Sequence, residues 1–143
     1  MTSKKKIERE LVIKSSTDNL AVVRKFIETS ALESGFSKEV VKKISLAVDE
    51  ACTNIIKHAY NYSPDNDIII LTNFSDSKFT VTITDSGHNF NPKLVPEPNL
   101  KEYVKQHKVG GLGMYLMKKL MDEVKYNTLS GNQNQVVLVK YLT

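Results

Sequence analysis

The spacing of apolar residues changes along this chain in an order that few folds can accommodate. Five stretches have the alternating or short apolar patterns typical of strands, and three longer stretches repeat apolar residues every three or four positions, as amphipathic helices do. The expected strands cover residues 8–14, 68–73, 78–85, 124–129 and 135–142, and the expected helices cover 20–34, 38–60 and 112–123. This order predicts an α+β fold, a two-layer α/β sandwich with a mostly antiparallel sheet and the helices on one face.

Length and composition predict a single soluble domain over residues 1–143. The 41% apolar and 25% charged residues are ordinary for a globular protein, and no apolar run reaches the roughly 18 to 20 residues that span a bilayer. No apolar stretch follows the lysines at 4–6 to form a secretory signal, and Cys52 has no second cysteine to pair with. We therefore expect a cytoplasmic protein with no membrane partner. The net charge of +4, without a recognised nucleic-acid module, predicts no direct nucleic-acid binding.

The second expected helix carries polar side chains at a position suited to a cleft. Its buried face should hold the apolar residues at helical spacing, Val41, Ile44, Val48, Ala51, Ile55 and Ala59. Glu50 and Asn54 are four residues apart and are therefore neighbours at the border between this face and solvent. They either line a cleft or form the polar flank of the helix. Cys52 is expected to pack in the core, and His58 to lie at its edge.

The third expected strand ends in Asp85, and Gly87 follows two residues later in "TITDSGHNF" (82–90). Aspartate followed by glycine at a strand end is a common turn. A carboxylate at this place can also accept a hydrogen bond from an exocyclic amine such as that of adenine, and a glycine lets a flat ring approach the backbone. Both interpretations fit this segment taken alone.

Three glycines, Gly110, Gly111 and Gly113, lie at the start of the last expected helix. The first N–H groups of a helix have no intrahelical partner, so this start presents donors and the positive end of the helix dipole to an anion, typically phosphate. The irregular segment before it, within 86–109, is long for a compact domain, and such segments are often lids or binding loops. We expect a lid at about 91–109.

In combination, the three segments resemble the N, G1 and G2 boxes of the GHKL ATPases, which share the Bergerat, or histidine-kinase-like ATPase, fold. Within that superfamily, "VDEACTNIIKHAY", "ITDSGHNFNP" and "GGLGMYLMKKLMDEV" are similar to the small bacterial anti-sigma-factor serine/threonine protein kinases. The resemblance extends from the first expected strand to the last. The glycine segment is the most diagnostic, because its similarity continues well past the glycines.

The resemblance implies a role for each candidate residue. Glu50 would be the catalytic general base, and Asn54 would hold Mg²⁺ through its side-chain oxygen. Asp85, supported by Gly87, would recognise the adenine of ATP. Gly110, Gly111 and Gly113 would wrap the phosphates under the lid.

The implied function is that of a regulatory kinase that binds Mg-ATP and sequesters a sigma factor. It would phosphorylate a serine or threonine of a small anti-sigma-factor antagonist of the STAS type, and relatives of this kind act as homodimers. One alternative is a catalytically inactive ATP-binding module that only binds a partner. Another is the catalytic domain of a sensor histidine kinase, but the chain leaves no room for the dimerising helix pair that carries the phosphoacceptor histidine.

One departure from the family pattern concerns the adenine end of the site. Some relatives carry a Gly-x-Thr-like element before the last strand, and this chain has "GNQNQVV", with Gln135 at the place where the threonine is expected. The adenine contacts on that side are therefore not fixed by the resemblance.

Overall fold

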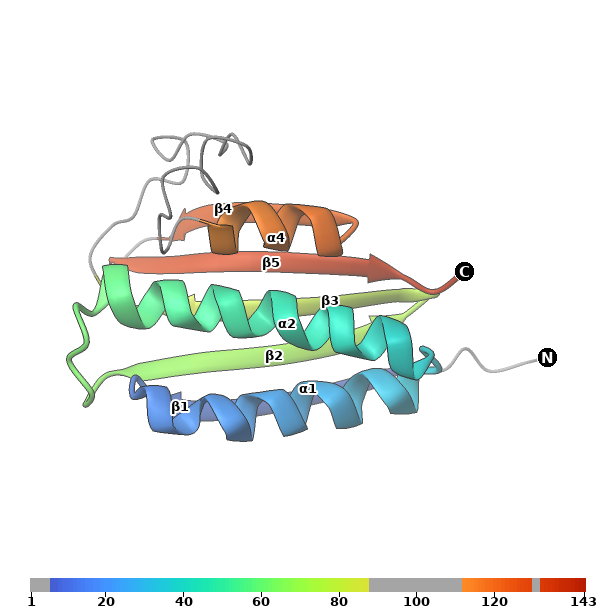
Figure 1. Cartoon of the computed structure of the whole chain (residues 1–143), viewed down its shortest axis with the longest axis horizontal. Helices are drawn as coiled ribbons and strands as arrows, with labels where there is room; N and C mark the ends of the chain where they lie inside the picture. The colour runs from blue at the N-terminus through green and yellow to red at the C-terminus, as the bar shows by residue number, and fades with distance from the viewer. Residues whose placement is uncertain (1–5, 88–111, 130–131) are drawn as a thin grey trace, which may run out of the picture.

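A five-stranded antiparallel sheet forms one layer of the protein and helices form the other (Figure 1). The computed structural model describes residues 6–87, 112–129 and 132–143. The strands are β1 (Ile7–Lys14), β2 (Asp67–Ser75), β3 (Lys78–Asp85), β4 (Glu123–Leu129) and β5 (Gln133–Tyr141), arranged side by side in the order β1-β2-β3-β5-β4. The predicted α+β sandwich is therefore confirmed, with every strand pair antiparallel.

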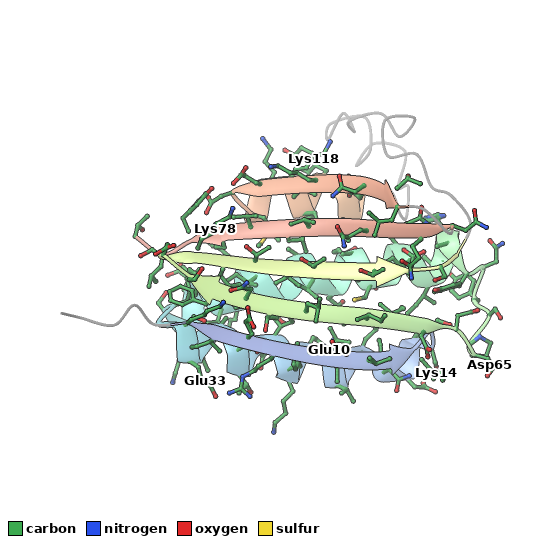
Figure 2. All side chains as sticks on the ribbon, turned by 180° about the vertical axis from the view of Figure 1, so that it is seen from behind. Glu10, Lys14, Glu33, Asp65, Lys78 and Lys118 are labelled. Carbon is green, nitrogen blue, oxygen red and sulfur yellow. The ribbon has the colours of Figure 1, made fainter. Side chains whose placement is uncertain are left out.

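The helices lie on one face of this sheet (Figure 1). They are α1 (Leu20–Ser34), α2 (Lys38–Asn54) and α4 (Leu112–Leu120), with a 3-10 turn, η1 (Thr17–Asn19), before α1 and a π-helical turn, η2 (Ile55–Ala59), after α2. Seen from behind, the other face of the sheet carries side chains such as Glu10 and is covered by no helix of the described residues (Figure 2). Within those same residues, no helix has both the length and the apolar character needed to cross a membrane.

Local sequence signals account for the boundary between α1 and α2. Gly35 ends α1 with a φ of 107°, a left-handed conformation that favours glycine, and its N–H is donated to the carbonyl groups of Ala31 and Leu32. Ser37 then caps α2, because its hydroxyl accepts a hydrogen bond from the Val40 N–H at 3.3 Å. The short connection places the two helices side by side, where they pack on each other.

Side chains along β3 alternate between the two faces of the sheet, and this alternation determines where its last residue lies. Phe79, Val81 and Ile83 are buried on the helix-covered face, and the intervening threonines lie on the other face. Asp85 continues the buried series and is only 5% exposed. A carboxylate thus occupies the position of a core residue at the end of the strand, beneath the helix layer.

The end of the second helix differs from its prediction as one α-helix reaching Tyr60. The α-helix ends at Asn54, and the chain continues as the π-helical turn η2, closed by a hydrogen bond from the Tyr60 N–H to the Ile55 carbonyl at 3.0 Å. The predicted buried face is confirmed through Ile55 and Ala59, and Cys52 is fully buried. His58 is exposed, not at the core edge as expected. The last helix also ends earlier than predicted, at Leu120 instead of 123.

Candidate functional site

The candidate residues gather at one end of the sandwich. The C-terminal end of α2, the end of β3 and the first residues of β5 meet there, at the left of Figure 1. Gly113 lies in the first turn of α4, which packs against α2. Gly110, Gly111 and the expected lid at 91–109 lie outside the described residues.

Glu50 lies on α2 in a partly buried position. Desolvation by this burial raises the pKa of its carboxyl group, the neighbouring charge of Asp49 raises it further, and Lys57 acts in the opposite direction. Asp49 itself lies 3.7 Å from the Nε atom of Arg24 on α1. A carboxyl group with a raised pKa in a partly shielded position is suited to accept a proton.

Asn54 is the last residue of α2, one turn after Glu50. The Nδ2 atom of its amide is buried and has no hydrogen-bond partner among the described residues. Buried polar groups in proteins nearly always have a partner, so this Nδ2 donor is available to a group outside the described residues. The expected Mg²⁺ contact concerns the side-chain oxygen of Asn54 and stays a prediction.

Asp85 is held in a tight turn after β3. Its Oδ1 atom accepts a hydrogen bond from the Gly87 N–H at 2.9 Å and another from the Asn134 amide at 3.2 Å. Burial raises the pKa of this carboxyl group, whereas the two hydrogen bonds lower it. No described residue donates a hydrogen bond to the other carboxylate oxygen, Oδ2, which therefore keeps its capacity to accept one.

Gly87 has a structural reason to be glycine that the sequence did not reveal. A Cβ atom at this position would lie 2.5 Å from the carbonyl oxygen of Ala59, closer than real contacts allow. The turn after β3 is therefore packed directly on η2, five residues beyond Asn54. This contact brings the Asp85 turn against η2, which directly follows the helix that carries Glu50 and Asn54.

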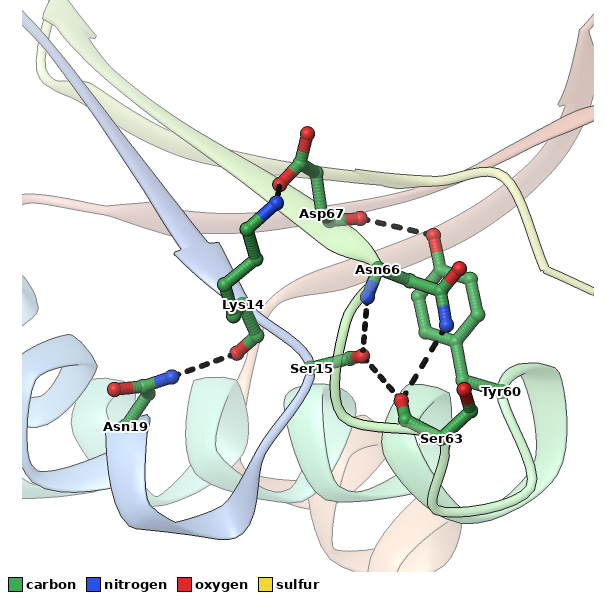
Figure 3. Close-up of polar contacts among 7 residues, drawn as sticks. All are labelled: Lys14, Ser15, Asn19, Tyr60, Ser63, Asn66 and Asp67. Carbon is green, nitrogen blue, oxygen red and sulfur yellow. Dashed lines mark hydrogen bonds and ion pairs between the residues drawn. The ribbon is translucent and has the colours of Figure 1, made fainter.

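Tyr60 is a residue of the site that sequence reasoning missed. Its hydroxyl donates to the Asp67 carbonyl at 2.8 Å, as Figure 3 shows, and accepts a hydrogen bond from the Ser86 N–H at 2.7 Å. The loop between η2 and β2 is anchored to Ser15, the residue after β1, whose hydroxyl donates to the Ser63 carbonyl at 2.5 Å and accepts from the Asn66 N–H at 3.1 Å. A tyrosine directly after the helix, in "HAY", was the available signal.

A cavity of about 550 Å³ lies beside this turn. Its lining contains uncharged residues from the end of η2, the following loop, the Asp85 turn and the hairpin between β4 and β5: Ala59, Tyr60, Ser63, Asn66, Ser86, Gly87 and Asn132. Uncharged polar groups around an open cavity are suited to a base or a sugar more than to a triphosphate.

Gln135 lies away from the candidate site. In the antiparallel register Gln135 lies opposite Thr84, on the face of the sheet away from the helices, where its Oε1 atom is 3.5 Å from the Asn127 amide. The residue opposite Asp85 is Asn134. A difference of one residue in the register reverses the face, and the sequence of the hairpin did not reveal that difference.

The chain is similar to known proteins over most of its length. The profile of the family described as "Histidine kinase-like ATPase domain" matches residues 13–140. The serine-protein kinase RsbW of Bacillus velezensis is 32% identical over 138 residues, which cover 93% of this chain and 84% of the relative. The protein of the same name from Bacillus subtilis strain 168 is 30% identical with the same coverage, and that of Listeria innocua is 32% identical over 78% of this chain and 73% of its own.

A solved structure shows the same fold. The crystal structure of the RsbU and RsbW domains of a Mycobacterium tuberculosis protein matches 95% of this chain with a TM-score of 0.68 and 14% sequence identity, and this chain spans 32% of that longer one. The resemblance inferred from the three sequence segments is thus confirmed. The chain belongs to the histidine kinase-like ATPase domain family and, within it, to the serine-protein kinases represented by RsbW.

Proposed function

We propose that this protein is a regulatory serine/threonine kinase of the cytoplasm, which binds Mg-ATP, sequesters a sigma factor and phosphorylates a small STAS-type antagonist of its own anti-sigma action. The observation that carries the proposal is that Glu50, whose pKa is raised by burial, lies one turn before Asn54 on α2, whose buried Nδ2 atom has no partner among the described residues. The contact between Gly87 and Ala59 supports it, because it holds the Asp85 turn against the end of the same helix.

Glu50 is the general base of this proposal. As the hydroxyl oxygen of the acceptor residue forms its bond to the γ-phosphorus of ATP, the hydroxyl proton passes to the Glu50 carboxylate. The bond between that phosphorus and the oxygen bridging to the β-phosphate breaks, and ADP leaves with the electron pair. The raised pKa of Glu50 makes its carboxylate a stronger proton acceptor than an exposed one.

Asn54 is the residue that would hold Mg²⁺. The donor set fits this ion, because Mg²⁺ prefers oxygen ligands, keeps several waters and often takes only one or two protein ligands beside substrate phosphates. In the proposal, the Asn54 side-chain oxygen and the phosphate oxygens together would supply such ligands. When bound, the ion would neutralise charge on the phosphates during transfer.

Asp85 and Gly113 define the two ends of the proposed nucleotide site. The Asp85 carboxylate accepts a hydrogen bond from the exocyclic amine of adenine. The start of α4, with Gly110 and Gly111 before it, binds the phosphates through backbone N–H groups. The cavity beside Gly87 supports a base-binding role for the Asp85 end, because its lining residues within the described part of the chain are uncharged and most of them are polar.

The test of the kinase proposal is phosphate transfer to a purified antagonist. The protein is incubated with Mg-ATP and an antagonist encoded near its gene, and the antagonist mass is measured for the gain of one phosphate. Glu50→Gln is expected to abolish transfer while largely preserving ADP binding, because it removes the base and keeps the side-chain size. ADP binding without transfer by the unaltered protein would instead support an ATP-dependent binding module.

The partner proposals have separate measurements. Sedimentation of the protein alone tests the proposed homodimer. Sedimentation with a purified sigma factor, with and without Mg-ATP, tests sequestration. A sigma factor that stays separate under both conditions would contradict the anti-sigma role and leave the kinase proposal standing.

A further inference from the structure

We propose that Asn134 determines the base specificity of this site by fixing which oxygen of Asp85 faces a bound nucleobase. The inference rests on the proposed nucleotide-binding function and adds a residue that lies outside the three resembling segments. Asn134 is at the start of β5 and lies directly opposite Asp85 in the β3–β5 register. Residues directly opposite each other in an antiparallel pair point to the same face, so both side chains lie on the helix-covered side.

The amide of Asn134 bridges two parts of the turn. Its Nδ2 atom donates to Asp85 Oδ1 at 3.2 Å and to the Gly87 carbonyl at 3.3 Å. Both partners are acceptors only, so chemistry fixes the orientation of the amide: with nitrogen and oxygen exchanged, three acceptor oxygens would face one another. Asn134 therefore links the carboxylate to the backbone of the turn that follows it.

This bridge makes the two oxygens of Asp85 unequal. Oδ1 accepts from both the Gly87 N–H and the Asn134 amide, and two donors occupy the lone pairs of one carboxylate oxygen. Oδ2 receives no hydrogen bond from the described residues. With the carboxylate plane fixed, Oδ2 is the oxygen left to accept a hydrogen bond from a ligand. It attracts an exocyclic amine, as in adenine, and repels a carbonyl oxygen at the same place.

The neighbouring residues do not share this role. The Tyr60 hydroxyl binds the Ser86 N–H and does not bond to the carboxylate. Gln135, the next residue of β5, pairs with Thr84 and lies on the opposite face. Asn134 is thus a positioning residue for base selection, and Gln135 provides a matched control on the same strand.

The experiment compares two ligands that differ by one group. Calorimetry measures binding of ADP and of purine riboside 5′-diphosphate, which lacks only the 6-amino group, to the unaltered protein, Asn134→Leu and Gln135→Ala. We expect the unaltered protein to prefer ADP by about 10- to 100-fold, as for a hydrogen bond to a charged group. Asn134→Leu, which has similar volume and no donor, should lose about tenfold in ADP affinity and keep its affinity for the analogue. Gln135→Ala should leave both affinities unchanged.

Equal losses for both ligands in Asn134→Leu would overturn the proposal, because a purely structural role weakens both alike. If that variant does not fold, Asn134→Thr and Asn134→Val replace it, since both side chains suit a strand and differ only in a hydroxyl donor. The threonine variant should keep more of the ADP preference than the valine variant, and equal preferences would overturn the proposal. An unaltered protein that binds neither ligand would refute the proposed function itself, and the inference with it.

Discussion

Glu50 carries its charge at a position that disfavours it. Burial and the charge of Asp49 raise the pKa of its carboxyl group, with Lys57 opposing them. Because the pKa is higher in the folded state than in the unfolded state, protonation stabilises the fold, and this stabilisation is lost as pH rises through the folded-state pKa. We expect Glu50→Gln to raise the free energy of unfolding at pH 7 by about 0.5 kcal/mol, a small value because the side chain is partly exposed to solvent.

Urea unfolding at pH 7 and pH 4 measures this effect. The advantage of Glu50→Gln should shrink at pH 4, where Glu50 of the unaltered protein gains its proton. Glu28→Gln, an exposed position on α1, is the control and should show no advantage. A Glu50→Gln variant that is less stable than the unaltered protein at pH 7 would contradict the raised pKa.

Gly87 tolerates no side chain, because a Cβ atom would meet the Ala59 carbonyl oxygen at 2.5 Å. Gly87→Ala is expected to lower the free energy of unfolding by about 1–3 kcal/mol, as overpacking does, and to weaken ADP binding by displacing the Asp85 turn. Thermal unfolding and calorimetry measure the two effects. Ser86→Ala changes an exposed side chain of the same turn and should leave the free energy of unfolding nearly unchanged, and an equal loss of stability in the two variants would refute this packing account.

The Tyr60 hydroxyl joins three elements of the fold. Tyr60 follows η2, and its hydroxyl bonds to the Asp67 carbonyl at the start of β2 and to the Ser86 N–H just after β3. Tyr60→Phe leaves both backbone groups without this partner, and we expect a loss of about 1–2 kcal/mol in unfolding free energy. Amide hydrogen exchange should accelerate at Ser86. Tyr62→Phe is the control, since Tyr62 is 60% exposed. Unchanged exchange at Ser86 in Tyr60→Phe would show that the turn does not depend on this bond.

At the scale of elements, local patterns predicted most of the fold and long-range contacts decided the rest. The alternation of apolar and polar residues along β3 is visible in the sequence, and it implies the buried position of Asp85. The π-helical turn at Ile55 was not, because its i to i−5 hydrogen bond brings no change in the pattern of buried residues. Asn134 was missed for a related reason, since its face depends on the register of a hairpin whose turn the sequence leaves ambiguous.

The whole molecule should be stabilised by its nucleotide. A ligand that binds only the folded state at 100 times its dissociation constant adds about 2.7 kcal/mol to the free energy of unfolding. We expect Mg-ADP to raise the thermal midpoint accordingly. Asp85→Asn should remove most of this increase, because an amide placed at Oδ2 can present a donor to the adenine amine. A full ligand-induced increase in Asp85→Asn would contradict base recognition by Asp85.

The bridge from Asn134 to Asp85 joins positions 49 residues apart in the chain. Pairings between such distant segments form slowly, because the entropy cost of closing the loop comes before the free energy gained from the contacts. The Asp85 turn is therefore complete only after the hairpin of β4 and β5 packs against β3. In a refolding experiment, nucleotide binding will therefore appear later than secondary structure. The rate at which binding appears reports the rate of the final step of folding.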